Sequence, residues 1–178
     1  TLSTGDIIGF QGRHGAHAWL GVPYAQAPVG ELRWKAPLRS LPWEGRKEML
    51  NYGVQCPQLP VVPNIDIDTA FVGAEDCLRL NVWAPTYHKD GVPAADEALP
   101  VMFWIHGGGN SVGNGGSDLS HLYDGSIMAI EQKVIVVSVN HRLGPLGWFF
   151  HDALRETSDT QEDASGNYGT LDLISALG

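Results

Sequence analysis

The stretch Val101-Met102-Phe103-Trp104-Ile105-His106-Gly107-Gly108-Gly109 decides the fold of this 178-residue chain. Its first five residues are all apolar, and such a run predicts a strand that is buried on both faces in the middle of a sheet. The three glycines that follow allow a tight backbone turn, because no Cβ restricts their φ and ψ angles. The stretch therefore predicts a central strand that opens into a glycine loop.

A second apolar run, at residues 134–139, predicts another fully buried strand. Between the two runs, Asp124 can cap a helix over residues 126–132. The residues expected to face inward from this helix are Ile127, Met128 and Ile130. Two strands joined through a helix form a crossover unit, which indicates an α/β sheet.

Shorter strands are predicted at residues 6–10, 16–20 and 78–84, where apolar residues are bounded by glycines or alternate with polar ones. The polar residues 86–98 predict a hairpin-like excursion. Near the end of the chain, Thr170 is a suitable N-cap for a helix. The apolar residues at helical spacing in this helix are Leu171, Ile174 and Leu177.

The composition, with 43% hydrophobic and 17% charged residues, is that of a soluble globular domain. A net charge of -9 argues against nucleic acid and anionic membrane surfaces as partners. No apolar run approaches the roughly 20 residues that a membrane-spanning helix needs. The chain begins at Thr1 without a leader pattern, so we expect either a processed end or a boundary cut within a longer chain.

The chain has two cysteines, Cys56 and Cys77, and their spacing alone leaves their pairing open. If they pair, the bond closes a loop of 20 intervening residues and stabilises the fold by roughly 3 kcal/mol. Such a bond implies an oxidising compartment, so the expected location is secreted or periplasmic. Neither cysteine has a further Cys or His at zinc-ligand spacing.

Residues 106–109 (His-Gly-Gly-Gly) carry the strongest chemical signal. Glycine N–H groups after a buried strand can point at one spot and stabilise the oxyanion that forms when an ester carbonyl is attacked. The same tetrapeptide is typical of the loop after the third strand of α/β-hydrolases. Removing one such donor costs about 3 to 4 kcal/mol of transition-state stabilisation.

The chain resembles the N-terminal part of a type-B carboxylesterase, from the cholinesterase-like branch of the α/β-hydrolases. The resemblance runs nearly from end to end and is most specific in Glu75-Asp76-Cys77-Leu78-Arg79-Leu80-Asn81-Val82. The matching blocks, in the family's order, are residues 20–25, 28–34, 56–58, 75–82, 100–109, 139–147 and 166–169. The resemblance implies one α/β-hydrolase domain, with a central mixed, mostly parallel sheet and flanking helices, of which residues 1–178 are the N-terminal segment.

The resemblance also implies roles for individual residues. In the family the second and third glycines, here Gly108 and Gly109, line the oxyanion hole, and Gly107 and His106 support the loop. The residues with implied structural roles are Cys56 and Cys77 as a disulfide, Arg33 with Glu75 as an ion pair, and Arg142 with Asp76 as a second ion pair.

By the same resemblance the nucleophilic Ser, the acid and the base lie beyond Gly178, so we expect the chain to be truncated before the nucleophile elbow and inactive alone. The implied activity of the full-length protein is hydrolysis of a small-molecule carboxylic ester by acyl-enzyme chemistry. Its implied partner is the remaining C-terminal part of the same protein, and no cofactor is implied. Two alternatives stay open: a catalytically inactive cholinesterase-like adhesion or binding protein, and an inactive fragment.

Residues 109–113 (Gly-Asn-Ser-Val-Gly) also satisfy the Gly-x-Ser-x-Gly pattern of a nucleophile elbow. That motif needs a helix directly behind the Ser, whereas the glycines and asparagines of residues 110–116 disfavour a helix. We therefore predict that Ser111 is not the nucleophile.

The histidines are predicted to be structural. His106 lies at a strand end, where we expect its ring to hydrogen-bond within the loop rather than to act as a general base. His14 and His17 have the spacing of a metal-binding pair but lie in a glycine turn, so we expect no metal site there. The other histidines, His141 among them, stand alone in the sequence.

Two residues depart from the family's pattern at the site. Asn110 replaces the aromatic residue that usually follows the three glycines, which should alter the wall of the acyl pocket. His141 replaces the Tyr that usually precedes Arg142.

Cholinesterases place a Trp inside the disulfide loop to bind quaternary ammonium by cation–π attraction, whereas Phe71 is the only aromatic residue within residues 57–76 here. We therefore expect no choline selectivity in the intact protein. Its kcat/KM for acetylcholine should not exceed that for the uncharged isostere, dimethylbutyl acetate. A clear preference for acetylcholine would contradict this expectation.

Overall fold

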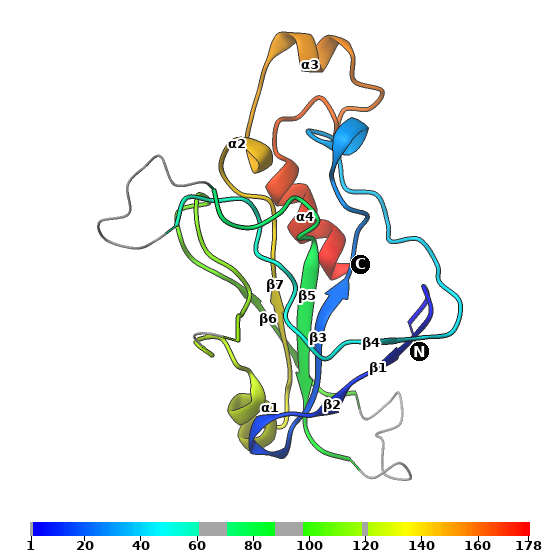
Figure 1. Cartoon of the computed structure of the whole chain (residues 1–178), viewed down its shortest axis with the longest axis vertical. Coiled ribbons are helices and arrows are strands. Elements are labelled where there is room, and N and C mark those ends of the chain that lie inside the picture. The colour runs from blue at the N-terminus through cyan, green and yellow to red at the C-terminus, as the bar shows by residue number, and fades with distance from the viewer. Residues whose placement is uncertain (1, 61–70, 88–97, 119–120) are drawn as a thin grey trace.

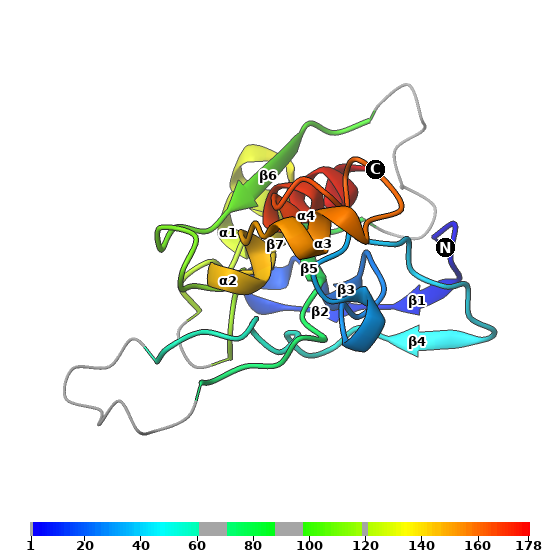
Figure 2. The same ribbon diagram turned by 90° about the horizontal axis from the view of Figure 1, so that it is seen from above.

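A five-stranded sheet in the order β2-β3-β5-β7-β6 runs through the computed structural model (Figure 1). Its strands are β2 (Phe10–Gln11), β3 (His17–Pro23), β5 (Arg79–Ala84), β6 (Val101–Ile105) and β7 (Ile135–Val139). A separate parallel pair, β1 (Asp6–Ile8) and β4 (Arg46–Glu48), lies on the β3 side, away from β6 (Figures 1 and 2). The structure describes residues 2–60, 71–87, 98–118 and 121–178.

Short helices accompany the sheet, and the longest, α4, lies over one of its faces (Figure 2). The α-helices are α1 (Ser126–Gln132), α2 (Gly144–Gly147), α3 (Asp152–Glu156) and α4 (Tyr168–Leu177), and the 3-10 turns are η1 (Arg13–Gly15) and η2 (Gly30–Leu32). No helix in the described ranges is long and apolar enough to cross a membrane. The excursion predicted at residues 86–98 falls almost entirely outside the described residues.

The sheet is mixed, as the resemblance implies. β6 and β7 run parallel and are joined through α1, which confirms the predicted crossover unit. The other three neighbouring pairs are antiparallel, so this part of the sheet is not mostly parallel. Parallel neighbours need a crossover connection, which a helix supplies only between β6 and β7 among the described strands.

The position of β6 corrects the prediction of a central strand buried on both faces. β6 lies at the edge of the described sheet, and Val101 and Ile105 are 60% and 48% exposed. β7 holds the interior position instead, with Val136 and Val139 almost fully buried. An uninterrupted apolar run indicates that both faces of a strand can be buried. It does not determine the position of the strand in the sheet, because strand order depends on segments far away in the sequence.

Helix α1 has the predicted bounds, and the Asp124 carboxylate accepts a hydrogen bond from Ser126 N at 2.9 Å. Its buried residues are Ser126 and Ala129, which is packed in the core cluster around Trp83. The prediction of the inward face was wrong for Ile127 and Met128, which are exposed. Small residues face the core, and a Cβ at Gly125, the N-cap position, would lie 2.7 Å from the side chain of Val136 on β7.

Cys56 and Cys77 form a disulfide, which confirms that prediction. Both cysteines are buried in a core cluster that includes Leu78 and Leu143. The bond therefore fixes the segment around Cys56 between the start of β5 and the residues that follow β7.

The Arg142 guanidinium is buried and fully engaged. It donates to both carboxylate oxygens of Asp172, at 2.8 and 2.6 Å, and to Lys35 O at 2.8 Å. The predicted pairing of Arg142 with Asp76 is wrong, because Asp76 forms an ion pair with Arg79 at 2.9 Å on the surface. The true partner lies 30 residues further along the chain, where α4 folds back onto the segment after β7.

Arg33 and Glu75 form the ion pair that the resemblance implies. The guanidinium donates to both carboxylate oxygens, at 2.6 and 2.8 Å. This bidentate pairing raises the pKa of Arg33, through hydrogen bonding first and charge attraction second. The pair lies at the surface, where it links η2 to the segment that precedes Cys77.

Helix α4 begins three residues earlier than predicted, with Asn167 rather than Thr170 at the N-cap position. Its buried residues are Tyr168, Gly169 and Asp172. The predicted apolar stripe is largely open, since Ile174 and Leu177 are 61% and 67% exposed. Within the described residues the helix is therefore held by its buried ion pair and its first turn.

Replacing Asp172 with Asn should lower the free energy of unfolding by about 3–5 kcal/mol, because it leaves a buried guanidinium without its counter-charge. Asp76→Asn is the matched control, since that surface pair contributes at most about 1 kcal/mol. Urea-induced unfolding of the intact protein, followed by tryptophan fluorescence, measures both changes. Equal losses for the two variants would contradict the assignment of Asp172 as the partner of Arg142.

Candidate functional site

The glycine loop leaves the end of β6 and folds into a tight turn. Gly108 and Gly109 have φ angles of +125° and +60°, and Asn110 continues at +58°. The carbonyl oxygen of Gly108 accepts hydrogen bonds from the N–H groups of Ser111 and Val112, at 3.1 and 3.2 Å. A Cβ at position 108 would lie 1.8 Å from the carbonyl oxygen of Val112, so this turn requires glycine there.

The N–H groups of Gly108 and Gly109 are the next feature of the loop. In the part of the chain that the structure describes, neither group donates a hydrogen bond to the protein, and both residues are exposed. Because both residues are exposed, their N–H groups can be solvated and are accessible to a ligand. Two successive free donors, in a loop that other bonds hold in place, form a site that can bind a negatively charged oxygen.

The far end of the loop is held by the buried side chain of Gln58. Its Oε1 accepts a hydrogen bond from Gly113 N at 2.7 Å, and its Nε2 donates to Gly113 O at 2.8 Å. Nε2 also donates to Cys56 O at 3.0 Å. Because Cys56 is bonded to Cys77, the disulfide fixes the side chain that holds the loop.

Polar side chains on and after the central strands hold the next turn of the loop. Asn140 Oδ1 accepts a hydrogen bond from Gly115 N at 2.6 Å, and Ser138 Oγ donates to Gly115 O. Asn81 on β5 donates in turn to Ser138 Oγ at 3.0 Å. All three side chains are buried, so the sheet itself satisfies the backbone of the loop that crosses it.

His106 and His141 stack face to face below the loop. Their ring centroids are 4.7 Å apart, and the rings lie within 6° of parallel. His106 Nδ1 is 2.9 Å from Gly107 O, and His141 Nδ1 is 3.0 Å from Arg142 O. A carbonyl oxygen only accepts, so in each ring Nδ1 carries the proton. The Nε2 of His106 is buried and has no partner among the described residues.

Burial lowers the pKa of both His106 and His141 from the usual 6.5. The neighbouring His141 lowers the pKa of His106 further, while hydrogen bonds to carbonyl groups act in the opposite direction. Both rings are therefore neutral at pH 7. His106 contacts the loop at Gly107 O, and its role as a support of the loop stays a prediction.

Ser111 lies in an exposed turn, and no helix occurs between residues 107 and 118. Its hydroxyl donates to Gly109 O at 3.2 Å. No His ring or carboxylate in the described ranges forms a hydrogen bond with it, whereas a nucleophilic serine needs a base within reach. This environment supports the prediction that Ser111 is not the nucleophile.

His14 and His17 occupy different local environments. His14 is in η1 with a φ angle of +55°, and His17 Nε2 accepts a hydrogen bond from Tyr87 N at 3.2 Å. Among the residues that the structure describes, no three His, Cys, Asp or Glu side chains gather where they could hold a metal ion.

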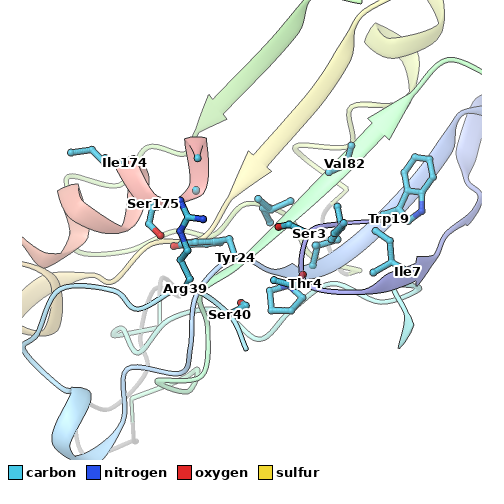
Figure 3. Close-up of a pocket in the computed structure, with 16 residues that line it drawn as sticks. Ser3, Thr4, Ile7, Trp19, Tyr24, Arg39, Ser40, Val82, Ile174 and Ser175 are labelled. Atoms are coloured by element: carbon cyan, nitrogen blue, oxygen red, sulfur yellow. The ribbon is translucent and has the colours of Figure 1, made fainter. Parts of the chain in front are cut away.

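A cavity of about 730 Å³ lies over β3 and β5, away from the glycine loop (Figure 3). Its lining includes Trp19, Tyr24, Arg39 and Ile174, which come from β3, the segments that follow it, and α4. None of its lining residues belongs to residues 106–116, so this cavity is not part of the candidate site.

The mixed sheet, the crossover through α1 and the glycine loop at the end of β6 define an α/β-hydrolase fold. The chain superposes on the N-terminal third of a thermophilic PNB esterase, with a TM-score of 0.78 and 38% identity, over 99% of this chain and 33% of that one. The sequence model of the carboxylesterase family matches residues 1–178, and the chain belongs to that family.

Characterised relatives agree with this assignment. The para-nitrobenzyl esterase of Bacillus subtilis is 41% identical over 164 residues, which are 92% of this chain and 30% of that protein. The cocaine esterase of Oryctolagus cuniculus is 33% identical over 180 residues, which are 97% of this chain and 30% of that protein. The chain thus spans 30% of the length of these relatives.

No sequence pattern predicted the side chains that hold the loop. Gln58 stands in a block that carries the family resemblance, which marks the position without revealing its hydrogen bonds. His141 was expected to stand alone, and the structure corrects this by stacking it on His106. Polar residues inside an apolar strand, such as Asn81 and Ser138, are the signal that could have indicated a buried network.

Replacing Gln58 with Ala should loosen the glycine loop, because the N–H and C=O groups of Gly113 both lose their partner. Leaving such groups unpaired costs about 1–3 kcal/mol, so we expect that loss of stability and faster hydrogen exchange in residues 106–116. Gln26→Ala is the control, because the side chain of Gln26 makes one exposed hydrogen bond. Unchanged exchange in Gln58→Ala would show that Gln58 does not hold the loop.

Proposed function

We propose that the intact protein containing this chain is a carboxylic-ester hydrolase that works by serine acyl-enzyme chemistry, with Gly108 and Gly109 as donors of its oxyanion hole. The observation that carries the proposal is the pair of unpaired N–H groups in a chain of the carboxylesterase family. An oxyanion hole needs donors that are fixed before the reaction begins, and this loop is fixed by Gln58 and Asn140.

In this reaction a serine hydroxyl attacks the ester carbonyl, and a His takes the proton while an acid orients the His. The carbonyl oxygen becomes negatively charged in the tetrahedral intermediate, and the two glycine N–H groups stabilise that charge. His106 and Gly107 hold the loop in shape. The serine, the His and the acid belong to the part of the protein beyond residue 178, which is the chain's obligatory partner.

The proposed substrate is a small-molecule carboxylic ester. Two relatives are named para-nitrobenzyl esterase and cocaine esterase. The loop at residues 106–116 offers backbone N–H donors, which suit an ester oxygen, and carries no Asp, Glu, Lys or Arg side chain. The disulfide supports a secreted or periplasmic location, because such bonds persist in oxidising compartments.

Labelling of the intact protein with a fluorophosphonate, which bonds covalently to an activated serine, tests this proposal. We expect one labelled serine outside residues 1–178, found by peptide mass mapping, and equal labelling of the Ser111→Ala variant. An adduct on Ser111 would overturn the rejection of that residue as nucleophile. Absence of labelling would favour the inactive adhesion or binding protein.

The same probe tests the glycine donors, because its phosphonyl oxygen needs the oxyanion hole as an ester oxygen does. Gly108→Ala should slow labelling by about 100-fold or more, since the added Cβ collides with Val112 O and displaces the loop. Gly107→Ala is the matched control, because a Cβ there meets no atom within 4 Å and the carbonyl group that His106 contacts is kept. Equal labelling rates for both variants would remove Gly108 from the oxyanion hole.

A further inference from the structure

His141 is a buried side chain that the proposed chemistry does not use. It is 1% exposed, stacks on His106, and meets the ring of Trp148 edge-on at 5.7 Å. We propose that His141 is a positioning residue, which holds His106 and thereby keeps the glycine loop in the conformation that presents the N–H groups of Gly108 and Gly109. This inference rests on the proposed function.

His106 touches both arms of the loop, so the orientation of its ring determines the path of the loop. On the outgoing arm, its Nδ1 donates to Gly107 O at 2.9 Å. On the returning arm, a Cβ at Gly113 would lie 2.4 Å from the same Nδ1, so the backbone passes directly against the ring. His141 stacks on a face of this ring, with the ring centroids 4.7 Å apart, and so limits its tilt.

The supporting ring is itself held by a rigid part of the fold. His141 Nδ1 donates to Arg142 O, and the Arg142 side chain is buried against Asp172. The same segment reaches the loop a second time, because Gly144 N donates to Asn110 O at 2.7 Å. The segment from His141 to Gly144 therefore contacts the loop before and after the two donor glycines, once by stacking and once by a hydrogen bond.

The support depends on both rings being neutral. The charged groups near His141 are Arg142 and Asp172, which neutralise each other, and the titratable group facing His106 is His141. A proton on either ring would place a charge in a buried stack without a free carboxylate. The pKa of both rings is lowered, so the neutral stack contributes fully above pH 6.5 and is lost as the pH falls through the lowered pKa values.

Two variants of the intact protein separate stacking from simple bulk, with a p-nitrophenyl ester as substrate. His141→Ala removes the ring and should lower kcat by about 10- to 100-fold at pH 8, with KM changed less than about threefold. His141→Phe keeps a flat ring that cannot titrate, and should retain kcat at pH 8 within about threefold. His121→Asn, at an exposed histidine, is the control and should leave kcat unchanged.

The dependence of kcat on pH provides a second test, because a purely structural role of His141 predicts no change in it. The His141→Phe variant should keep a larger fraction of its pH 8 kcat than the wild type at about pH 5.5, because one titrating ring of the stack is gone. In NMR spectra of protein labelled with carbon-13 histidine, the His106 signal should titrate below pH 6.5 in the wild type.

The outcomes are distinguishable. A wild-type protein that neither hydrolyses esters nor reacts with the fluorophosphonate would overturn the proposed function, and the positioning role with it. An active wild type with unchanged kcat in His141→Ala would overturn the positioning role alone. If His141→Ala does not fold, a pH profile in His141→Phe identical to that of the wild type would overturn it equally.

Discussion

The buried guanidinium of Arg142 needs a counter-charge, and Asp172 on α4 provides it. A charge of this kind without a partner would cost several kcal/mol, so the position of α4 is tied to that of the residues after β7. Arg142 also donates to Lys35 O, and it directly follows His141 in the chain. The ion pair between Arg142 and Asp172 thus fixes the position of α4, of the segment around Lys35 and of the His141 ring that stacks on His106.

The loop itself depends on a second set of contacts, the hydrogen bonds that hold its returning arm to the sheet. Gln58 binds both polar groups of Gly113, while Asn140 and Ser138 bind those of Gly115. Glycines allow the path of the loop, and the buried amides and the hydroxyl select it. The N–H groups of Gly108 and Gly109, which donate to no described residue, lie at the start of a loop whose returning arm is firmly bonded.

Local patterns in the sequence were sufficient for the crossover unit and the glycine loop, because both depend on neighbouring residues. The bounds of α1 and the rejection of Ser111 as an elbow rest on the same local rules. The partner of Arg142 and the stacking of His141 could not be predicted, since each joins segments 30 or more residues apart. The edge position of β6 was missed for the same reason, as strand order is a property of the whole sheet.

The open edge of β6 has a practical consequence for work with this chain. Its outer side has no strand partner among the described residues, and Trp104 and Ile105 are exposed beside it. Such an edge is a template for strand addition from any chain that meets it, another copy included. We therefore expect a polypeptide limited to these residues to self-associate through this edge at the concentrations used for assays. Co-expression with the rest of the protein should reduce this self-association.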